Sequence, residues 1–290
     1  MSIREQHVTI AGRAVRYLEA GEGEPVLLIH AFPLSADLWR PQLAAPPPGW
    51  RLLAPDLRGF RGPGGGPGDV APRGDVTMDD YARDLIALLD HLNVARAVVG
   101  GVSMGGYVTF SLLRQAPDRV RALVLADTRP QADGEEGRAK RREMLALIER
   151  GGVEAVAGAM LPALVGRTSH NERPEVVAEV RRLVLANHPA AVRAAVSAMM
   201  TRSDSTRLLA SIACPTLVVV GEEDVITPVA DATALHDAIA GSRLAVLPEA
   251  GHLASLETPG AFDAALARFL AERVADLRDD RPGGPPASVP

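Results

Sequence analysis

Short apolar runs alternate with longer helical patterns along most of the chain. Continuous runs of aliphatic residues are typical of strands that are covered on both faces of a parallel sheet. Six segments have this character: 25–30, 52–56, 97–100, 120–126, 216–220 and 244–247. Because such strands alternate with helical patterns, the chain is predicted to have an α/β fold with a mostly parallel sheet.

The first twenty residues follow a different pattern. Residues 7–10 and 15–18 alternate apolar and polar side chains on either side of Gly12. This alternation predicts an antiparallel hairpin at one edge of the sheet, which brings the expected number of strands to eight.

Helices are expected between the strands. Thr77 is a suitable N-cap for a helix with two aspartates in its first turn and apolar residues at i, i+3, i+4 spacing. A second helix is expected from Ser103 to about Gln115, and a third over 259–277.

The alternation stops between residues 129 and 205. This stretch has four helical patterns and no strand pattern, at 135–150, 153–164, 174–186 and 190–200. We therefore expect a helical cap inserted over one edge of the sheet. The predicted division is an α/β core over 1–128 and 206–277, a cap over 129–205, a flexible Gly- and Pro-rich loop over 61–74, and a disordered tail over 278–290.

Composition excludes several classes of function. The chain has 290 residues and a formal charge of −5, which argues against a nucleic-acid or anionic-membrane surface. No apolar run approaches the ~20 residues that span a bilayer. The first residues lack the apolar core of a signal peptide, so the expected location is the cytoplasm. Cys214 is the only cysteine, which excludes an intrachain disulfide or a cysteine-cluster metal site.

The most informative motif is Gly101-Val102-Ser103-Met104-Gly105, a G-x-S-x-G sequence that follows a predicted strand and opens a predicted helix. A sharp turn at this place strains the backbone of the serine, and the glycines make room for it. The turn would expose the hydroxyl of Ser103, which predicts a nucleophile.

A serine nucleophile needs a base. His252 follows the last predicted strand, and so lies at the carboxyl edge of the sheet where Ser103 is expected. His30 begins the loop after an earlier strand, and we expect it to brace that loop. The remaining histidines are expected at the surface: His7, His91, His170, His188 and His236.

The base needs an acid that orients it. Glu222, Glu223 and Asp224 all follow the strand at 216–220. Asp224 is the preferred candidate because it lies on the loop proper, before a helix that opens at Pro228. Asp127, at the end of the strand 120–126, is the alternative.

Two backbone amides are expected to form an oxyanion hole. One is the amide of Met104, next to the nucleophile, and the other is the amide of Phe32, in the loop after the strand 25–30. The residues expected to line a substrate pocket are Phe32, Trp39, Met104, Met144 and Met160.

These residues resemble the α/β-hydrolase superfamily over about residues 5–275. The order Ser103, Asp224, His252 is the order of that fold. The segments 101–107, 221–228 and 249–257 are similar to those of 3-oxoadipate enol-lactonases, small carboxylesterases and cofactor-free haloperoxidases (perhydrolases). The chain departs from the family at 60–62, and in having Ala31 after His30 where the family usually has glycine. That alanine fits if its φ is negative.

The resemblance implies a serine hydrolase that needs no metal or organic cofactor and acts on a small carboxylic ester. A lactonase, such as a 3-oxoadipate enol-lactonase, is the nearest alternative. Its carboxylate substrate would require a cationic residue in the pocket, with five candidates: Arg129, Arg138, Arg141, Arg142 and Arg167. Haloalkane dehalogenation and epoxide hydrolysis are disfavoured because position 103 is serine and not aspartate. A ligand receptor that keeps the fold without turnover is a further alternative.

Overall fold

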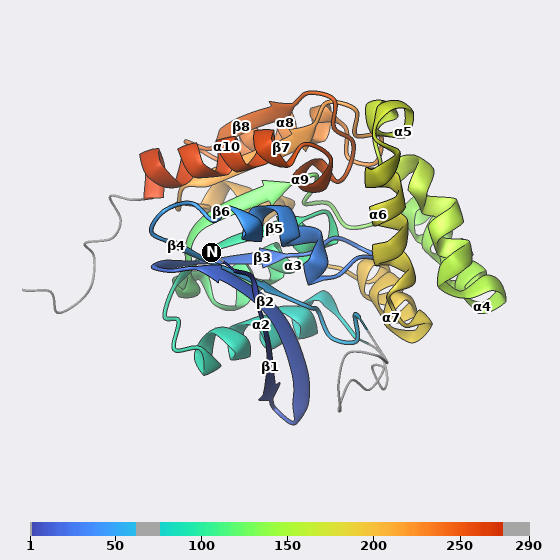
Figure 1. The fold of residues 1–290 in the computed structure, drawn as a ribbon, viewed down its shortest axis with the longest axis horizontal. Helices are drawn as coiled ribbons and strands as arrows, with labels where there is room; N and C mark the ends of the chain where they lie inside the picture. The colour runs from blue at the N-terminus through green and yellow to red at the C-terminus, as the bar shows by residue number, and fades with distance from the viewer. Residues whose placement is uncertain (1, 62–75, 275–290) are drawn as a thin grey trace, which may run out of the picture.

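A single eight-stranded sheet forms the centre of the molecule (Figure 1). The structure, a computed structural model, describes residues 2–61 and 76–274. The strands lie in the order β1-β2-β4-β3-β5-β6-β7-β8. Their bounds are β1 Arg4–Ile10, β2 Arg13–Gly21, β3 Glu24–Ile29, β4 Trp50–Pro55, β5 Ala97–Val102, β6 Val120–Ala126, β7 Thr216–Gly221 and β8 Arg243–Leu247. All neighbours from β4 to β8 pair in parallel, which confirms the predicted fold class.

The predicted hairpin is present at one edge of the sheet. β1 pairs antiparallel with β2, and the pairing runs up to Ile10 opposite Arg13. The two residues between them, Ala11 and Gly12, have φ of 49° and 76°. A two-residue turn with both φ angles positive matches the twist of the strands that it joins.

The core helices that the sequence predicts are present, among others that it does not predict. α2 (Met78–His91) begins after Thr77, whose hydroxyl accepts from the Asp80 amide while the Asp80 carboxylate accepts from the Thr77 amide. This reciprocal cap satisfies two amides that the helix itself leaves free. The other core helices are η1 Ala36–Trp39, α1 Arg40–Ala44, α3 Met104–Gln115, η2 Pro117–Arg119, η3 Thr206–Ser211, α8 Val229–Ala238, α9 Ala254–Glu257, α10 Pro259–Phe269 and the π-helical turn η4 Leu270–Val274.

Residues 129–205 are helical wherever they form regular structure. They contain α4 (Glu135–Leu164), α5 (Arg167–Glu172), α6 (Pro174–Leu185) and α7 (Pro189–Met200), which Figure 1 shows gathered on one side of the molecule. α4 spans both of the helices predicted over 135–150 and 153–164. Its backbone is not helical at Gly152, where φ is 59°, so the predicted interruption is present as a kink. The short, polar α5 was not predicted.

Three predictions fall wholly or largely outside the described residues. They are the flexible loop over 61–74, of which only Arg61 is described, the disordered tail over 278–290, and the last residues of the helix over 259–277. No helix within residues 2–61 and 76–274 has the length and apolarity needed to cross a bilayer.

The parallel pairing brings the ends of several strands to one edge. Val102 pairs with Ala126, and Gly221 pairs with Leu247. The residues that follow these four positions therefore emerge together at the carboxyl edge of the sheet, where open α/β sheets bind their ligands.

Candidate active site

Ser103 lies in a strained turn between β5 and α3. Its φ is 55° and its ψ is −113°, a conformation that residues with a side chain rarely adopt. The two flanking glycines are required by contact. A Cβ on Gly101 would lie 2.2 Å from the carbonyl carbon of Gly105, and a Cβ on Gly105 would lie 2.3 Å from the carbonyl oxygen of Ile29. The turn is the strand-to-helix elbow that the G-x-S-x-G sequence predicts.

A chain of hydrogen bonds joins Ser103, His252 and Asp224. The Ser103 hydroxyl donates to Nε2 of His252 across 2.8 Å. Nδ1 of His252 donates to Oδ2 of Asp224, also across 2.8 Å. His252 and Asp224 are buried, and Ser103 is 9% exposed. The three residues lie in the segments that follow β5, β7 and β8. A hydroxyl bonded to a histidine that is in turn bonded to a carboxylate is the arrangement that can activate a serine.

The environment of Asp224 favours the carboxylate form. Burial opposes ionisation, but the neighbouring His252 and hydrogen bonds from Thr227 outweigh it and lower the pKa of Asp224. Oδ1 accepts from the amides of Ile226 and Thr227 at 2.8 and 3.0 Å, and the Thr227 hydroxyl donates to Oδ2 at 2.7 Å. The Ile226 amide, two residues after Asp224, completes an Asx turn, and Thr227 was not predicted as a site residue.

Asp127, the alternative acid, has a different partner. Its Oδ1 accepts from the amide of Gly221 at 2.8 Å, and no hydrogen bond to His252 is present among the described contacts. Burial and the negative charge of Asp224 raise the pKa of Asp127 well above its usual range. The Asp127 carboxyl group therefore holds the end of β7 through its bond to Gly221, in an environment that opposes its ionisation.

The loop that carries Phe32 is held by His30, as expected. Nδ1 of His30 donates to the Ala31 carbonyl at 2.9 Å, and Nε2 accepts from the Leu57 amide at 3.0 Å. Ala31 is not one of the residues with positive φ, so the alanine is compatible with this loop. Met104 opens α3, where the first amides have no partner inside the helix. Both amides predicted for the oxyanion hole thus lie on segments that the fold fixes.

The predicted pocket residues differ in their surroundings. Trp39 is completely buried, and its ring packs against Phe262 of α10 at 5.7 Å between centroids. Phe32 and Met104 are also buried, while Met144 and Met160 are partly buried on α4. Whether these side chains contact a substrate stays a prediction.

None of the remaining histidines has a hydrogen bond to the Ser103 hydroxyl among the described contacts. His7, His91 and His170 are exposed as expected, whereas His188 and His236 are partly buried. Nδ1 of His188 accepts from the Ala190 amide at the start of α7, and His236 bonds to the Ser242 hydroxyl. Within residues 2–61 and 76–274, no group of three or more His, Cys, Asp or Glu side chains is arranged to hold a metal ion.

The fold agrees with that of known proteins. A family model for the alpha/beta hydrolase fold matches residues 24–259. The chain belongs to this family. It is 28% identical over 255 residues to a 3-oxoadipate enol-lactonase of Acinetobacter baylyi, covering 87% of this chain and 91% of the relative.

Two solved structures are similar over nearly the whole chain. A thermophilic esterase from Thermogutta terrifontis is 35% identical, with a TM-score of 0.84 and coverage of 92% of this chain and 98% of the esterase. The enol-lactonase from Burkholderia xenovorans is 27% identical, with a TM-score of 0.82 and coverage of 92% and 100%. This hydrolase therefore resembles both an esterase and enol-lactonases.

Proposed function

We propose that this hydrolase cleaves small carboxylic esters through a Ser103-His252-Asp224 triad and an acyl-enzyme. The observation that carries the proposal is the pair of 2.8 Å contacts that His252 makes with the other two residues. The strained turn at Ser103 and the similarity to the thermophilic esterase support it.

The reaction proceeds in two steps. Ser103 Oγ attacks the ester carbonyl carbon while Nε2 of His252 takes its proton, and the amides of Phe32 and Met104 bind the oxyanion. The tetrahedral intermediate then expels the alcohol, which receives the proton from His252. In the second step His252 takes a proton from water, whose oxygen attacks the acyl carbon. His252 then returns this proton to Oγ of Ser103 as the acid is released.

We further propose that α4–α7 form a cap over this edge of the sheet. In this proposal Phe32 and Met104 line the pocket from the core, and Met144 and Met160 of α4 limit the size of the acyl or alcohol group.

The test is hydrolysis of p-nitrophenyl esters from acetate to dodecanoate, beside 3-oxoadipate enol-lactone. Ser103→Ala and His252→Ala are expected to lower ester turnover by about 10⁴-fold or more while the circular dichroism spectrum is retained. Retained activity in either variant would contradict the triad. Inactivity of the folded wild type on every substrate would favour the receptor alternative.

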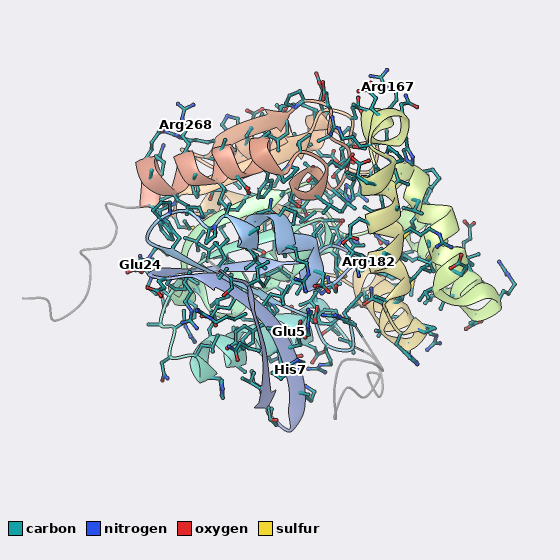
Figure 2. All side chains as sticks on the ribbon, viewed as in Figure 1. Glu5, His7, Glu24, Arg167, Arg182 and Arg268 are labelled. Carbon is teal, nitrogen blue, oxygen red and sulfur yellow. The ribbon has the colours of Figure 1, made fainter. Side chains whose placement is uncertain are left out.

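A lactonase is the second candidate, supported by the two enol-lactonases in the comparisons. Such a substrate carries a carboxylate, and four of the five candidate arginines already hold acidic or carbonyl partners at 3.4 Å or less: Arg138, Arg141, Arg142 and Arg167. Figure 2 shows Arg167 at the outer surface of the molecule beside α5.

Arg129 is the most available of the five for a substrate carboxylate. Among residues 2–61 and 76–274 it has one ion pair, to Asp133, which is 3.8 Å long, and its buried Nε has no hydrogen-bond partner there. If the lactone is the substrate, Arg129→Ala should raise KM for the lactone by about tenfold or more and leave p-nitrophenyl acetate unaffected. Arg142→Ala, on the exposed side of α4, is the matched control.

A further inference from the structure

Glu257 is a buried carboxylate whose oxygens accept four hydrogen bonds from two distant parts of the chain. It ends α9 and is 3% exposed. Oε1 accepts from the amides of Gly251 and Leu253 at 2.9 and 3.2 Å. Oε2 accepts from the Gly166 amide at 2.7 Å and from the Ser169 hydroxyl at 2.8 Å. The first pair belongs to the loop that carries His252, and the second pair to the start of α5.

The two loop contacts anchor the backbone on both sides of His252. The Gly251 amide donates from the residue before His252, and the Leu253 amide donates from the residue after it. One carboxylate oxygen therefore fixes the backbone on both sides of the histidine. Hydrogen bonds from amides to a carboxylate are stronger than those between neutral groups. With the backbone held in this way, the imidazole reaches Ser103 and Asp224 together.

The contacts with α5 extend this support to the loop of the acid. Glu223, which precedes Asp224, accepts from the amide and the hydroxyl of Thr168 at 2.8 and 2.7 Å. The packing at this junction is close, because a Cβ on Gly251 would lie 2.3 Å from the amide nitrogen of Gly166. Residues 166–169 therefore touch the loops of both His252 and Asp224.

Arg173 adds a second connection on the same side. Its guanidinium donates to the Glu257 carbonyl at 2.9 Å and to the Glu249 carboxylate at 2.6 Å. The segment from Gly166 to Arg173 is thus joined to both ends of the loop that holds His252.

We infer that Glu257 is a positioning residue for the reaction: it holds His252 in line with Ser103 and joins the histidine loop to α5. This inference rests on the proposed triad. Glu257 has no contact with substrate in this inference. Loss of the Glu257 carboxylate should therefore lower kcat more than it changes KM.

The experiment compares Glu257→Ala and Glu257→Gln with the wild type. Diethyl p-nitrophenyl phosphate reacts with an activated serine and releases p-nitrophenol once per active site, which measures the concentration of competent sites. The kcat and KM for p-nitrophenyl acetate are then expressed per titrated site. A side chain that only stabilises the fold would change the number of competent sites and leave kcat per site unchanged.

We expect Glu257→Ala to lower kcat per site by about 10²-fold, since a displacement of about 1 Å in a reacting group has an effect of this size. Glu257→Gln should lower kcat per site about tenfold. The NH2 group of the glutamine side chain must face N–H or O–H donors, from which it cannot accept a hydrogen bond. KM should change less than about threefold in both variants. If Glu257→Ala does not fold, Glu257→Gln decides the question.

Two control variants separate the effect on the His252 loop from the loss of any buried glutamate and from the loss of a contact with α5. Glu19→Gln changes another buried glutamate, on β2 and paired with Arg51, and should leave kcat per site within about twofold. Ser169→Ala removes only a contact on the α5 side and should have an effect of less than about threefold.

The outcomes distinguish this inference from the proposed function. A kcat per site within about twofold of wild type in Glu257→Gln, or in a folded Glu257→Ala, overturns the role of Glu257 alone. If the wild type hydrolyses no ester and Ser103 carries no added diethylphosphoryl mass, the triad fails and the role of Glu257 fails with it.

Discussion

Asp127 and Asp224 follow adjacent parallel strands, yet only Asp224 is hydrogen-bonded to His252. Asp127 turns its carboxyl group to the Gly221 amide at the end of β7. Its backbone has a φ of 44°, in a bend immediately after β6. Two buried carboxyl groups near each other cannot both ionise easily, and His252 and Thr227 favour the charged form of Asp224.

This difference predicts unequal effects of the same substitution. Asp224→Asn should lower kcat for p-nitrophenyl acetate by about 10³- to 10⁴-fold, because an amide cannot hold the tautomer that accepts the Ser103 proton. Asp127→Asn should lower it less than about tenfold, since the carbonyl oxygen of asparagine still accepts from Gly221. The reverse ranking would show that Asp127 is the acid.

The elbow predicts a strict requirement for glycine at position 105. The Cβ added by Gly105→Ala would lie 2.3 Å from the Ile29 carbonyl oxygen, against backbone that cannot move aside locally. We expect the free energy of unfolding to fall by about 2 kcal/mol or more, together with a loss of ester turnover. Urea unfolding and p-nitrophenyl acetate hydrolysis measure the two effects.

Gly158→Ala is the matched control for the elbow. Gly158 lies within α4, and no described atom outside the neighbouring helix backbone lies within 4 Å of the place its Cβ would take. Alanine in a helix is favoured over glycine, so this variant should be more stable by about 0.5–1 kcal/mol with unchanged turnover. Equal effects of the two substitutions would contradict the steric explanation.

His30 predicts a specific loss of stability in acid. Burial lowers the pKa of His30 to about 4, although its bond to the Ala31 carbonyl favours the protonated ring. In the unfolded chain the pKa of a histidine is about 6.5. The folded state therefore resists protonation, and the stability that His30 contributes is complete above about pH 6.5 and is lost as the pH falls towards 4.

The size of this effect is set by the difference in pKa, which corresponds to about 3 kcal/mol. The free energy of unfolding of the wild type should fall by this amount, relative to His30→Gln, between pH 7 and pH 4. Urea titrations of both proteins across this range provide the measurement. Parallel pH profiles for the two would show that His30 is not held neutral by burial.

A buried ion pair joins the two ends of the segment 129–205, where the chain leaves the core and returns to it. Oδ1 of Asp133, before α4, bonds to Nη1 of Arg202, after α7, at 2.8 Å, and Arg141 bonds to Oδ2 at 3.0 Å. Asp133→Ala leaves the Arg202 guanidinium buried with fewer partners and should lower the free energy of unfolding by about 3–5 kcal/mol. Lys140→Ala, which removes an exposed pair with Glu136, should change it by less than about 0.5 kcal/mol.

Much of the fold could be predicted because its signals are local. The buried strands appear as unbroken aliphatic runs, the hairpin as an alternation around Gly12, and the start of α2 as a threonine three residues before an aspartate. The turn at Ser103 is partly local, since Gly101 is required by its contact with Gly105 in the same five residues, whereas Gly105 is required by its contact with Ile29 of β3. For such features a short stretch of sequence contains most of the physical cause.

Contacts between distant segments had no such signal. The sequence alone left Asp127 and Asp224 as competing acids, did not reveal α5, and did not show what Glu257 contacts. Ser169 and Glu257 are 88 residues apart, and their hydrogen bond depends on how α5 packs against the loop after β8. The sequence by itself therefore determined the strands, the elbow and the set of candidate residues. Only the tertiary structure decided which of them meet, because burial and hydrogen-bond partners are set by packing between parts of the chain that no local pattern relates.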